Sequence, residues 1–442
     1  MLKRIFTIAL ITGAGQLFIV FILKYISQHS SLEQVKAIGQ MDSLVLLIMN
    51  IIALGLQPAA MRNLATTREW KLEYNNTQSA RLGLSVVIAV FALLALTDQY
   101  YLVFLIAPLL ALSGDYALYG RGYPVIGSLI AFFRSAIPFL LVFIWVKTEQ
   151  NGLPWIYFSG LIIAYLITDL AIALFLKVPV FPAFKLNDLV LYFKTLALGM
   201  VSLSLYFIGL GVILIASYFY STAVIATAFV GLKFYVIYKG VLRILHQAFI
   251  KDMINESICL KIDQLSAIAG VIFFGSLLIF PKAFIGFVFG TQYIDQQLFF
   301  ILLGIAGLLY SLFLSMATRS MLLKKDNIYM KVSVLAASLT ILSSTVLSFF
   351  WNNSSSIAIS ILIGEVFWMI GLIKIAGSFD DIKKRSLFTS QNLLLLFIPF
   401  GFRYLKGDLL FYYFIGFGIF SLLLLFLHYN KFRNLPIQQN SL

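Results

Sequence analysis

Long apolar runs separated by short polar segments repeat from one end of the chain to the other. The runs are rich in Leu, Ile, Phe and Val, and most are about 20 residues long, the length that lets an α-helix cross the hydrocarbon of a bilayer. Membrane β-barrels show alternating segments of about 10 residues instead. The pattern predicts fourteen helices, at residues 5–23, 41–60, 82–97, 101–119, 124–146, 154–176, 191–215, 222–242, 264–280, 298–317, 332–351, 357–377, 391–404 and 409–428. The thirteenth is short and contains Pro399, so a re-entrant or interfacial segment is the alternative there.

Composition narrows the class further. The chain is 61% hydrophobic and 11% charged, whereas soluble domains carry about 25% charged residues. Its mean hydropathy is +0.97. The predicted loops are too short to hold a soluble domain, and no GxxxxGK[ST] phosphate-binding loop occurs, which argues against an ATP-driven transporter. One cysteine and three scattered histidines predict neither a disulfide framework nor a metal site. We therefore expect an all-α integral membrane protein without a cofactor or catalytic residues.

The basic residues indicate the orientation. Lys3 and Arg4 precede the first apolar run, which fits either a signal peptide or a retained first helix. The run is long and lacks a small-residue cleavage site, so we favour a retained helix. Most of the 32 Lys and Arg residues then fall on the same side as this terminus, which predicts cytoplasmic N- and C-termini. The net charge of +14 is explained by this bias and by anionic lipid, without a nucleic-acid partner.

A weak internal duplication organises the chain. Helices 1–6 and 7–12 can be aligned, and in each half a basic, amphipathic inner loop follows the second helix, at residues 62–65 and 243–246. Two such repeats predict a pair of six-helix lobes around a central cavity, which opens alternately to either side. We expect lobes at residues 1–176 and 177–377, followed by additional membrane segments and a cytoplasmic tail at residues 378–442.

Charged residues inside the predicted helices are the candidate site. Charge in hydrocarbon is costly and usually faces a cavity or a partner. Arg134 and Lys233 fall near the middle of their helices in opposite predicted lobes, and aromatic residues surround both in the sequence. If both face the cavity, they form a cationic site suited to a diphosphate. Asp169, Glu365 and Asp115 are candidate acids for proton or sodium coupling.

Structural explanations remain open for each of these charges. Arg134 pairing with Asp169 or Asp115, and Lys233 pairing with Glu365, would only lock helices together. Other features have similar explanations: a helix N-cap for Asp42, inter-helix hydrogen bonds for Gln16 and Asn50, close helix packing for Gly13-Ala14-Gly15 and Gly209-Leu210-Gly211, and kinks at Pro108 and Pro138.

Two segments resemble a known family. Gln40-Met41-Asp42-Ser43-Leu44 and the later Gly55-Leu56-Gln57-Pro58-Ala59-Ala60-Met61-Arg62 resemble the second helix and basic exit of Wzx-type O-antigen flippases. Gly114-Asp115-Tyr116-Ala117-Leu118-Tyr119-Gly120-Arg121 looks like a segment common in polysaccharide flippases of the multidrug/oligosaccharidyl-lipid/polysaccharide exporter superfamily. Length and the absence of soluble domains agree with this resemblance, while fourteen predicted helices exceed the usual twelve.

The resemblance implies a V-shaped bundle of two lobes in a bacterial inner membrane. It implies that an undecaprenyl-diphosphate-linked oligosaccharide, such as an O-antigen or capsule repeat unit of polysaccharide biosynthesis, moves from the cytoplasmic to the periplasmic leaflet. Asp115, Gly120 and Arg121 would match the family's junction, with a structural or gating role. A polysaccharide polymerase and a chain-length regulator are the partners that it implies.

Two other functions remain open. A multidrug exporter of the same superfamily would bind cationic compounds, for which acidic cavity residues are expected. A membrane enzyme such as a polymerase or ligase would need a catalytic acid or base on a large external loop. The outer loops hold only scattered acids in short segments. The sign of the charge in the cavity is the feature that separates the first two readings.

Overall fold

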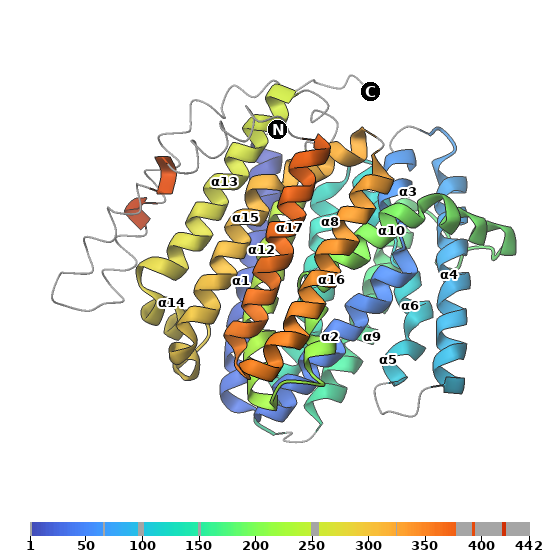
Figure 1. Ribbon diagram of the computed structural model, residues 1–442. Coiled ribbons are helices and arrows are strands. Elements are labelled where there is room, and N and C mark those ends of the chain that lie inside the picture. Colours follow the sequence, from blue (N-terminus) through green and yellow to red (C-terminus); the bar gives the residue numbers. More distant parts are fainter. Residues whose placement is uncertain are drawn as a thin grey trace. The chain divides into compact units, whose positions relative to one another are not determined.

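The computed structural model describes residues 2–64, 67–95, 101–148, 152–248, 256–323, 325–376, 391–393 and 418–420. Within these ranges the secondary structure is helical, and no strand occurs (Figure 1). Ten of the described helices are long and apolar enough to cross a membrane. The predicted helices at 391–404 and 409–428 lie almost wholly outside the described residues. The all-helical membrane fold that the apolar runs predict is confirmed.

The chain packs as two compact units, residues 1–230 and 231–442. These units are defined by packing, so the predicted duplication and the lobe boundary at residues 176/177 stay predictions. Unit 1 contains α1 (Leu2–His29), α2 (Leu32–Ala53), α3 (Leu56–Leu64), α4 (Trp70–Ala95), α5 (Tyr101–Leu105), α6 (Ala107–Ala111), α7 (Asp115–Gly120), α8 (Pro124–Trp145), α9 (Leu153–Leu176), η1 (Leu186–Val190), α10 (Leu191–Phe207) and α11 (Val212–Ala216). The helix α12 (Thr222–Ala248) begins in unit 1 and continues into unit 2.

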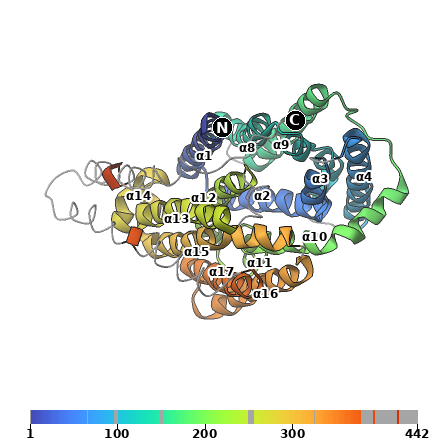
Figure 2. The same cartoon turned by 90° about the horizontal axis from the view of Figure 1, so that it is seen from above.

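In unit 1, the helices α1, α8 and α9 lie side by side (Figure 2). Small residues allow the close approach. A Cβ atom on Gly15 of α1 would lie 2.4 Å from the Phe132 ring of α8, and one on Gly160 of α9 would lie 2.7 Å from the Pro138 Cα atom. Membrane helices associate through this kind of packing because lipid tails provide no hydrophobic driving force between helices. The close packing predicted for the glycine motif of the first helix is therefore found at Gly15.

Unit 2 contains α13 (Glu256–Ile279), α14 (Pro281–Val288), η3 (Thr291–Gln296), α15 (Gln297–Leu322), α16 (Asp326–Phe350) and α17 (Ser354–Ala376). The helices α13, α15, α17 and α16 follow one another as packed neighbours in that order (Figure 2). Gly270 on α13 and Gly371 on α17 mark the closest approaches. A Cβ atom would lie 2.0 Å from the Ser311 hydroxyl oxygen in the first case and 2.1 Å from Val332 in the second.

The second predicted helix differs from the structure in both its start and its course. α2 begins nine residues earlier than predicted, behind a capping box in which Ser31 and Gln34 exchange hydrogen bonds. Asp42 is therefore not the helix N-cap that the sequence suggested. It is buried inside α2 and accepts a hydrogen bond of 2.6 Å from the Tyr157 hydroxyl. The helix then breaks at Leu54 and Gly55, both with positive φ.

Three further predicted elements are corrected. The helix predicted from residue 82 begins at Trp70, so much of the predicted inner loop 61–81 is helical. The helix predicted at 101–119 is divided into α5, α6 and α7, with Pro108 in the first turn of α6. The helix predicted at 191–215 is divided at residues 208–211, where the Gly211 amide donates to the Tyr206 carbonyl at 3.0 Å. Each break exposes carbonyl groups that other segments must satisfy.

Candidate functional site

The break between α6 and α7 is the starting point of the site. A helix end leaves its last carbonyls without partners, and in a membrane these need other donors. Gln78 of α4 donates from its amide nitrogen to the Leu112 carbonyl at 2.7 Å. Arg81, one turn further along α4, donates to the Leu110 carbonyl at 3.3 Å and to the Ser113 carbonyl. Both side chains are almost completely buried. They hold the chain at the point where α7 begins with Asp115.

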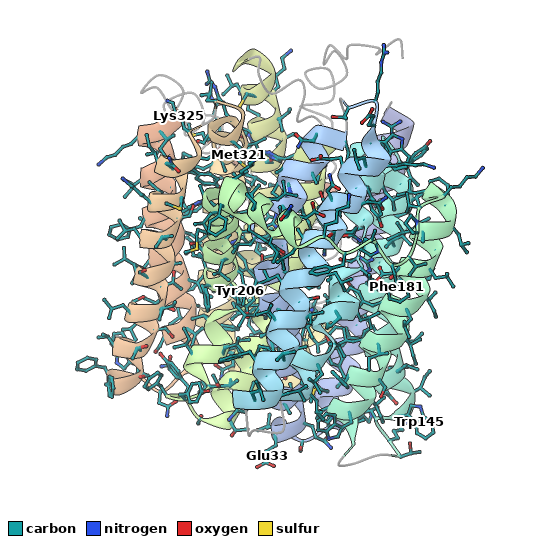
Figure 3. The ribbon with its side chains drawn as sticks, turned by 90° about the vertical axis from the view of Figure 1, so that its right-hand side faces the viewer. Glu33, Trp145, Phe181, Tyr206, Met321 and Lys325 are labelled. Atoms are coloured by element: carbon teal, nitrogen blue, oxygen red, sulfur yellow. The ribbon has the colours of Figure 1, made fainter. Side chains whose placement is uncertain are left out.

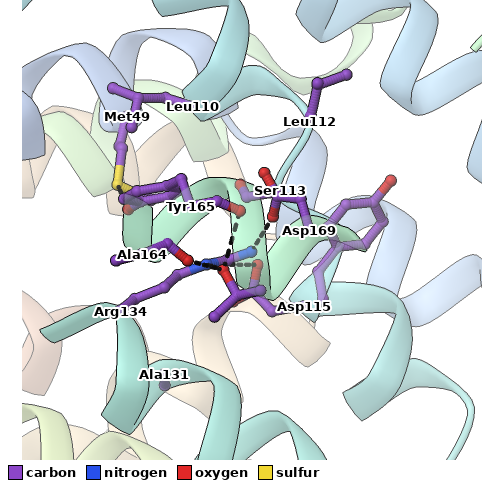
Figure 4. A network of polar contacts seen from close by, with 12 residues as sticks. Met49, Leu110, Leu112, Ser113, Asp115, Ala131, Arg134, Ala164, Tyr165 and Asp169 are labelled. Atoms are coloured by element: carbon purple, nitrogen blue, oxygen red, sulfur yellow. Dashed lines mark hydrogen bonds and ion pairs between the residues drawn. The ribbon is translucent and has the colours of Figure 1, made fainter. Parts of the chain in front are cut away.

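Arg134, at the middle of α8, lies between two carboxylates (Figure 4). Its guanidinium is 3.1 Å from an Asp115 carboxylate oxygen on α7 and hydrogen-bonds to Asp169 on α9. Its Nε atom donates to the Thr168 hydroxyl at 2.9 Å, and the guanidinium carbon lies 4.8 Å from the centre of the Tyr165 ring. One cation therefore ties three elements of unit 1 together, as the structural alternative for Arg134 predicted.

The residues of this cluster differ in charge and in how far their side chains are exposed. Arg134 and Asp169 are buried, whereas 27% of the Asp115 side chain is exposed. The second carboxylate oxygen of Asp169 is buried and accepts no hydrogen bond within the described part of the chain. Arg134 and the two aspartates together carry one more negative than positive charge when ionised. Breaking such a buried pair by removing one partner costs about 3–5 kcal/mol.

Glu365 and Lys233, the candidate residues of unit 2, are not paired as the structural alternative expected. The Glu365 carboxylate, buried on α17, accepts hydrogen bonds from the Lys239 ammonium at 2.7 Å and from the Tyr235 hydroxyl at 2.6 Å. The Lys239 nitrogen also lies 4.4 Å from the centre of the Tyr310 ring. Lys233 is half-buried on α12, six residues before Lys239. Because six residues correspond to about 600° of helix rotation, the two lysines occupy different faces of α12.

The junction residues Gly120 and Arg121 lie where α7 meets α3. A Cβ atom on Gly120 would lie 3.0 Å from the Met61 carbonyl oxygen, so glycine permits this approach. Arg121 donates to the Leu64 carbonyl at 3.3 Å and stacks 5.1 Å from the centre of the Trp70 ring. The contacts fasten the end of α7 to the segment between α3 and α4. They agree with a structural role and leave gating as a prediction.

Arg81 and Lys239 are absent from the predicted site residues, because the sequence places both near the basic side of the membrane. Both are buried inside helices and engage several partners each. A signal for Arg81 was present in the sequence. Gln78, Arg81 and Ser85 follow a spacing of three and four residues, which places polar side chains on one face of a helix. For Lys239 the sequence offers no comparable pattern.

Comparison with known proteins identifies structures of similar fold but no related sequence family. No protein-family profile and no curated protein matches the sequence. Solved structures do match. The lipid II flippase MurJ, in an inward closed conformation, shares 12% identity at a TM-score of 0.68, over 97% of this chain and 99% of its own. The chain therefore shares the fold of this structure.

Two further structures carry the same fold. A MATE protein in complex with MaL6 shares 13% identity at a TM-score of 0.59, over 87% of this chain and 96% of its own. An inward-facing multidrug resistance MATE family transporter of the MOP superfamily shares 14% identity at a TM-score of 0.54, over 86% of this chain and 99% of its own. At identities of 12–14%, these likenesses show the fold that the chains share.

Proposed function

We propose that this protein is a flippase that moves a polyprenyl-diphosphate-linked oligosaccharide from the cytoplasmic to the periplasmic leaflet of a bacterial inner membrane. The extent of the fold match carries the proposal. The MATE structures leave 13–14% of the chain unmatched, whereas the lipid II flippase leaves 3%. The chain thus has the length and fold of a MOP transporter that carries a lipid-linked cargo, together with the sequence resemblance to O-antigen flippases.

In this proposal Arg134 and Lys233 contact the diphosphate of the cargo. A guanidinium offers a planar fork for phosphate oxygens. Asp115 is the more exposed of the two carboxylates on Arg134, so it is the partner that a phosphate can replace at the smaller desolvation cost. Asp169 and Glu365 serve as ion-pair or coupling acids, and Gly120 and Arg121 form the gating junction. A polysaccharide polymerase and a chain-length regulator remain the proposed partners.

A multidrug exporter is the second candidate, and the charge at Arg134 favours it. Two carboxylates meet one guanidinium there, whereas a site for an anionic head group is expected to have an excess of cations. A cluster with surplus negative charge attracts cationic compounds. The sign of the charge is the feature that separates the two candidates, and the cluster of Arg134, Asp115 and Asp169 has one more acid than cations.

Complementation tests the two candidates. A bacterium that lacks its own O-antigen flippase but makes the lipid-linked repeat unit receives the wild-type chain, and surface polysaccharide is measured. In parallel, a strain lacking its drug exporters is tested for efflux of the cationic dye ethidium. Restored polysaccharide without dye efflux supports the flippase. Dye efflux without restored polysaccharide, while the precursor accumulates inside, supports the exporter instead.

The site is tested by substitutions in the same strain, at matched expression. Arg134→Ala and Lys233→Ala are expected to abolish surface polysaccharide, and Lys331→Ala, at an exposed lysine of α16, to leave it unchanged. The double variant Arg134→Ala/Asp169→Asn removes the cation and its buried partner together. Recovery of transport in this double variant would mean that Arg134 only balances charge. Continued loss, with a normally folded protein, supports contact with the cargo.

A further inference from the structure

A segment rich in exposed phenylalanines and lysines joins α9 to α10. Residues 177–194, the interfacial segment, leave α9 at Lys177 and continue through η1 into α10. Large apolar side chains project outward from it: Phe181 is 72% exposed, Leu186 70% and Phe193 81%, and Phe184 and Val190 are also exposed. Lys177, Lys185 and Lys194 are exposed along the same stretch. Asp188 is the only acid within it.

The interfacial segment is fixed to α4. The Lys185 amide donates to the Ser79 hydroxyl oxygen at 2.8 Å. The Lys71 ammonium donates to the Lys177 carbonyl at 3.1 Å. A Cβ atom on Gly83 would lie 2.8 Å from the Phe184 ring, so the absence of a side chain lets this ring rest on α4. These contacts hold the backbone in place while Phe181, Phe193 and the three lysines stay exposed.

Its position relative to a bilayer follows from its neighbours. Residues 153–176 and 186–207 are both long and apolar enough to span a membrane. Residues 177–185 therefore lie at one membrane face between two spans, and residues 186–194 are the part of the second span next to that face. Irregular backbone exposed to lipid is not tolerated within hydrocarbon. Pro179 and Pro182 lack the amide donors that would be hardest to satisfy near it. The segment therefore belongs at the boundary between hydrocarbon and head groups.

The side-chain chemistry fits that boundary and identifies a ligand. Segments that lie in the membrane interface combine Phe, Trp or Leu side chains with Lys or Arg, and lysine stems extend along apolar surface while the ammonium reaches the head groups. Phe181 is among the outward-facing side chains, and Trp145, at the far end of α8, lies lower in the same view (Figure 3). We infer that the interfacial segment binds the phosphate-bearing head groups of anionic phospholipids in the cytoplasmic leaflet. The leaflet follows from the predicted orientation, and the binding itself does not depend on the proposed cargo.

The charge pattern favours bulk phospholipid over a protein partner. The three lysines are spread along a segment that faces the bilayer, and no acidic side chain of the segment lies between Lys177 and Lys185. Each basic residue near an anionic membrane surface contributes about 1 kcal/mol, or about fivefold in affinity. Three of them on one fixed segment are expected to give a clear preference for anionic over zwitterionic lipid.

Lipid retention tests the inference. The full chain is purified in detergent with equal amounts of phosphatidylglycerol and phosphatidylcholine, and bound lipids are counted by native mass spectrometry. We expect the wild type to retain mainly phosphatidylglycerol and the triple variant Lys177→Gln/Lys185→Gln/Lys194→Gln to lose most of this preference. The control Lys282→Gln/Lys331→Gln/Lys374→Gln removes the same charge at exposed lysines elsewhere and is expected to keep it. Equal loss in both triple variants would overturn a specific site.

Two further measurements keep the inference testable. Added undecaprenyl diphosphate that displaces phosphatidylglycerol from the wild type stoichiometrically would show that the segment binds cargo rather than bulk lipid, which contradicts the inference. A spin label at position 181, in a Cys259→Ser background within a bilayer, reports depth. Relaxation by oxygen, but not by a water-soluble nickel chelate, is expected. The reverse would place the segment in water and overturn the inference.

Discussion

Arg81 donates hydrogen bonds to both oxygens of Ser113, to the hydroxyl at 2.8 Å and to the backbone carbonyl. Ser113 lies in the break between α6 and α7, two residues before Asp115. The guanidinium on α4 therefore supplies the donors that the broken helix lacks and fixes the start of α7. The ion pair between Asp115 and Arg134 depends on this fixed start, so Arg81 supports the cluster without touching Arg134.

Replacing Arg81 tests this support. A lysine keeps the charge but loses the planar fork that reaches several oxygens at once. We expect Arg81→Lys to lower the free energy of unfolding by about 2–3 kcal/mol, because buried carbonyls lose their partners. Thermal unfolding in detergent, followed by tryptophan fluorescence, measures the change. Arg68→Lys, at an exposed arginine before α4, is the matched control, and an equal effect in both variants would contradict the assigned role.

Helix bounds were predicted best from the sequence where a proline marks the start of a long apolar run. The helix expected at 124–146 is found at 124–145, and the one expected at 154–176 is found at 153–176. Both begin with a proline in the first turn, which signals a helix start. The breaks at Leu54–Gly55 and at Ser113–Gly114 escaped prediction because apolar residues lie on both sides of them. They exist because side chains distant in sequence, such as Tyr192 and Arg81, satisfy the freed carbonyls.

The candidate site was predicted as a set of residues but not as a set of partners. Burial of charge in hydrocarbon singles out Arg134, Asp169 and Glu365 from the sequence alone. Which charges meet depends on helix rotation, and long helices that are apolar all round do not reveal it. Lys239 therefore took the place beside Glu365 that Lys233 was expected to fill.

The pair of Lys239 and Glu365 predicts strong non-additivity. Lys239→Met leaves a buried carboxylate, and Glu365→Gln leaves a buried ammonium, so each single variant is expected to lose about 3–5 kcal/mol of stability. The double variant leaves no charge and is expected to be more stable than either single variant. Denaturant or thermal unfolding of all four proteins gives the interaction energy. Losses that simply add would show that the two side chains do not interact.

Alanine substitutions at Gly55 and Gly122 distinguish the cost of backbone strain from the cost of a steric clash. Both have positive φ, at 83° and 85°. A Cβ atom on Gly55 would lie 2.3 Å from the Thr195 carbonyl oxygen, whereas one on Gly122 would meet nothing within 4 Å. Gly122→Ala is therefore expected to cost about 1–2 kcal/mol of strain. Gly55→Ala adds a clash with the backbone of α10 and is expected to cost clearly more, measured as the shift in thermal unfolding. Equal shifts would mean that α3 and α10 separate freely.

His246 makes stability depend on pH. It lies on α12 beyond the span at residues 222–243, is 2% exposed, and has its Nε2 atom 2.7 Å from the Ser266 hydroxyl oxygen. Burial lowers the pKa of this side chain from 6.5 to about 3. The unfolded chain therefore binds a proton below pH 6.5 that the folded chain does not bind. Stability from this group is complete above pH 6.5 and falls as the pH drops, by about 1.4 kcal/mol per pH unit.

Unfolding of the wild type between pH 7.5 and 5 measures this slope, in a range above the ordinary pKa values of carboxylates. His246→Gln is expected to be less stable than the wild type at pH 7.5 but to lose the slope, because glutamine does not titrate. His29→Gln, at an exposed histidine, is expected to keep it. A slope that survives in His246→Gln would show that other groups cause it, whereas a wild type without the slope would show that His246 takes up its proton in the folded protein.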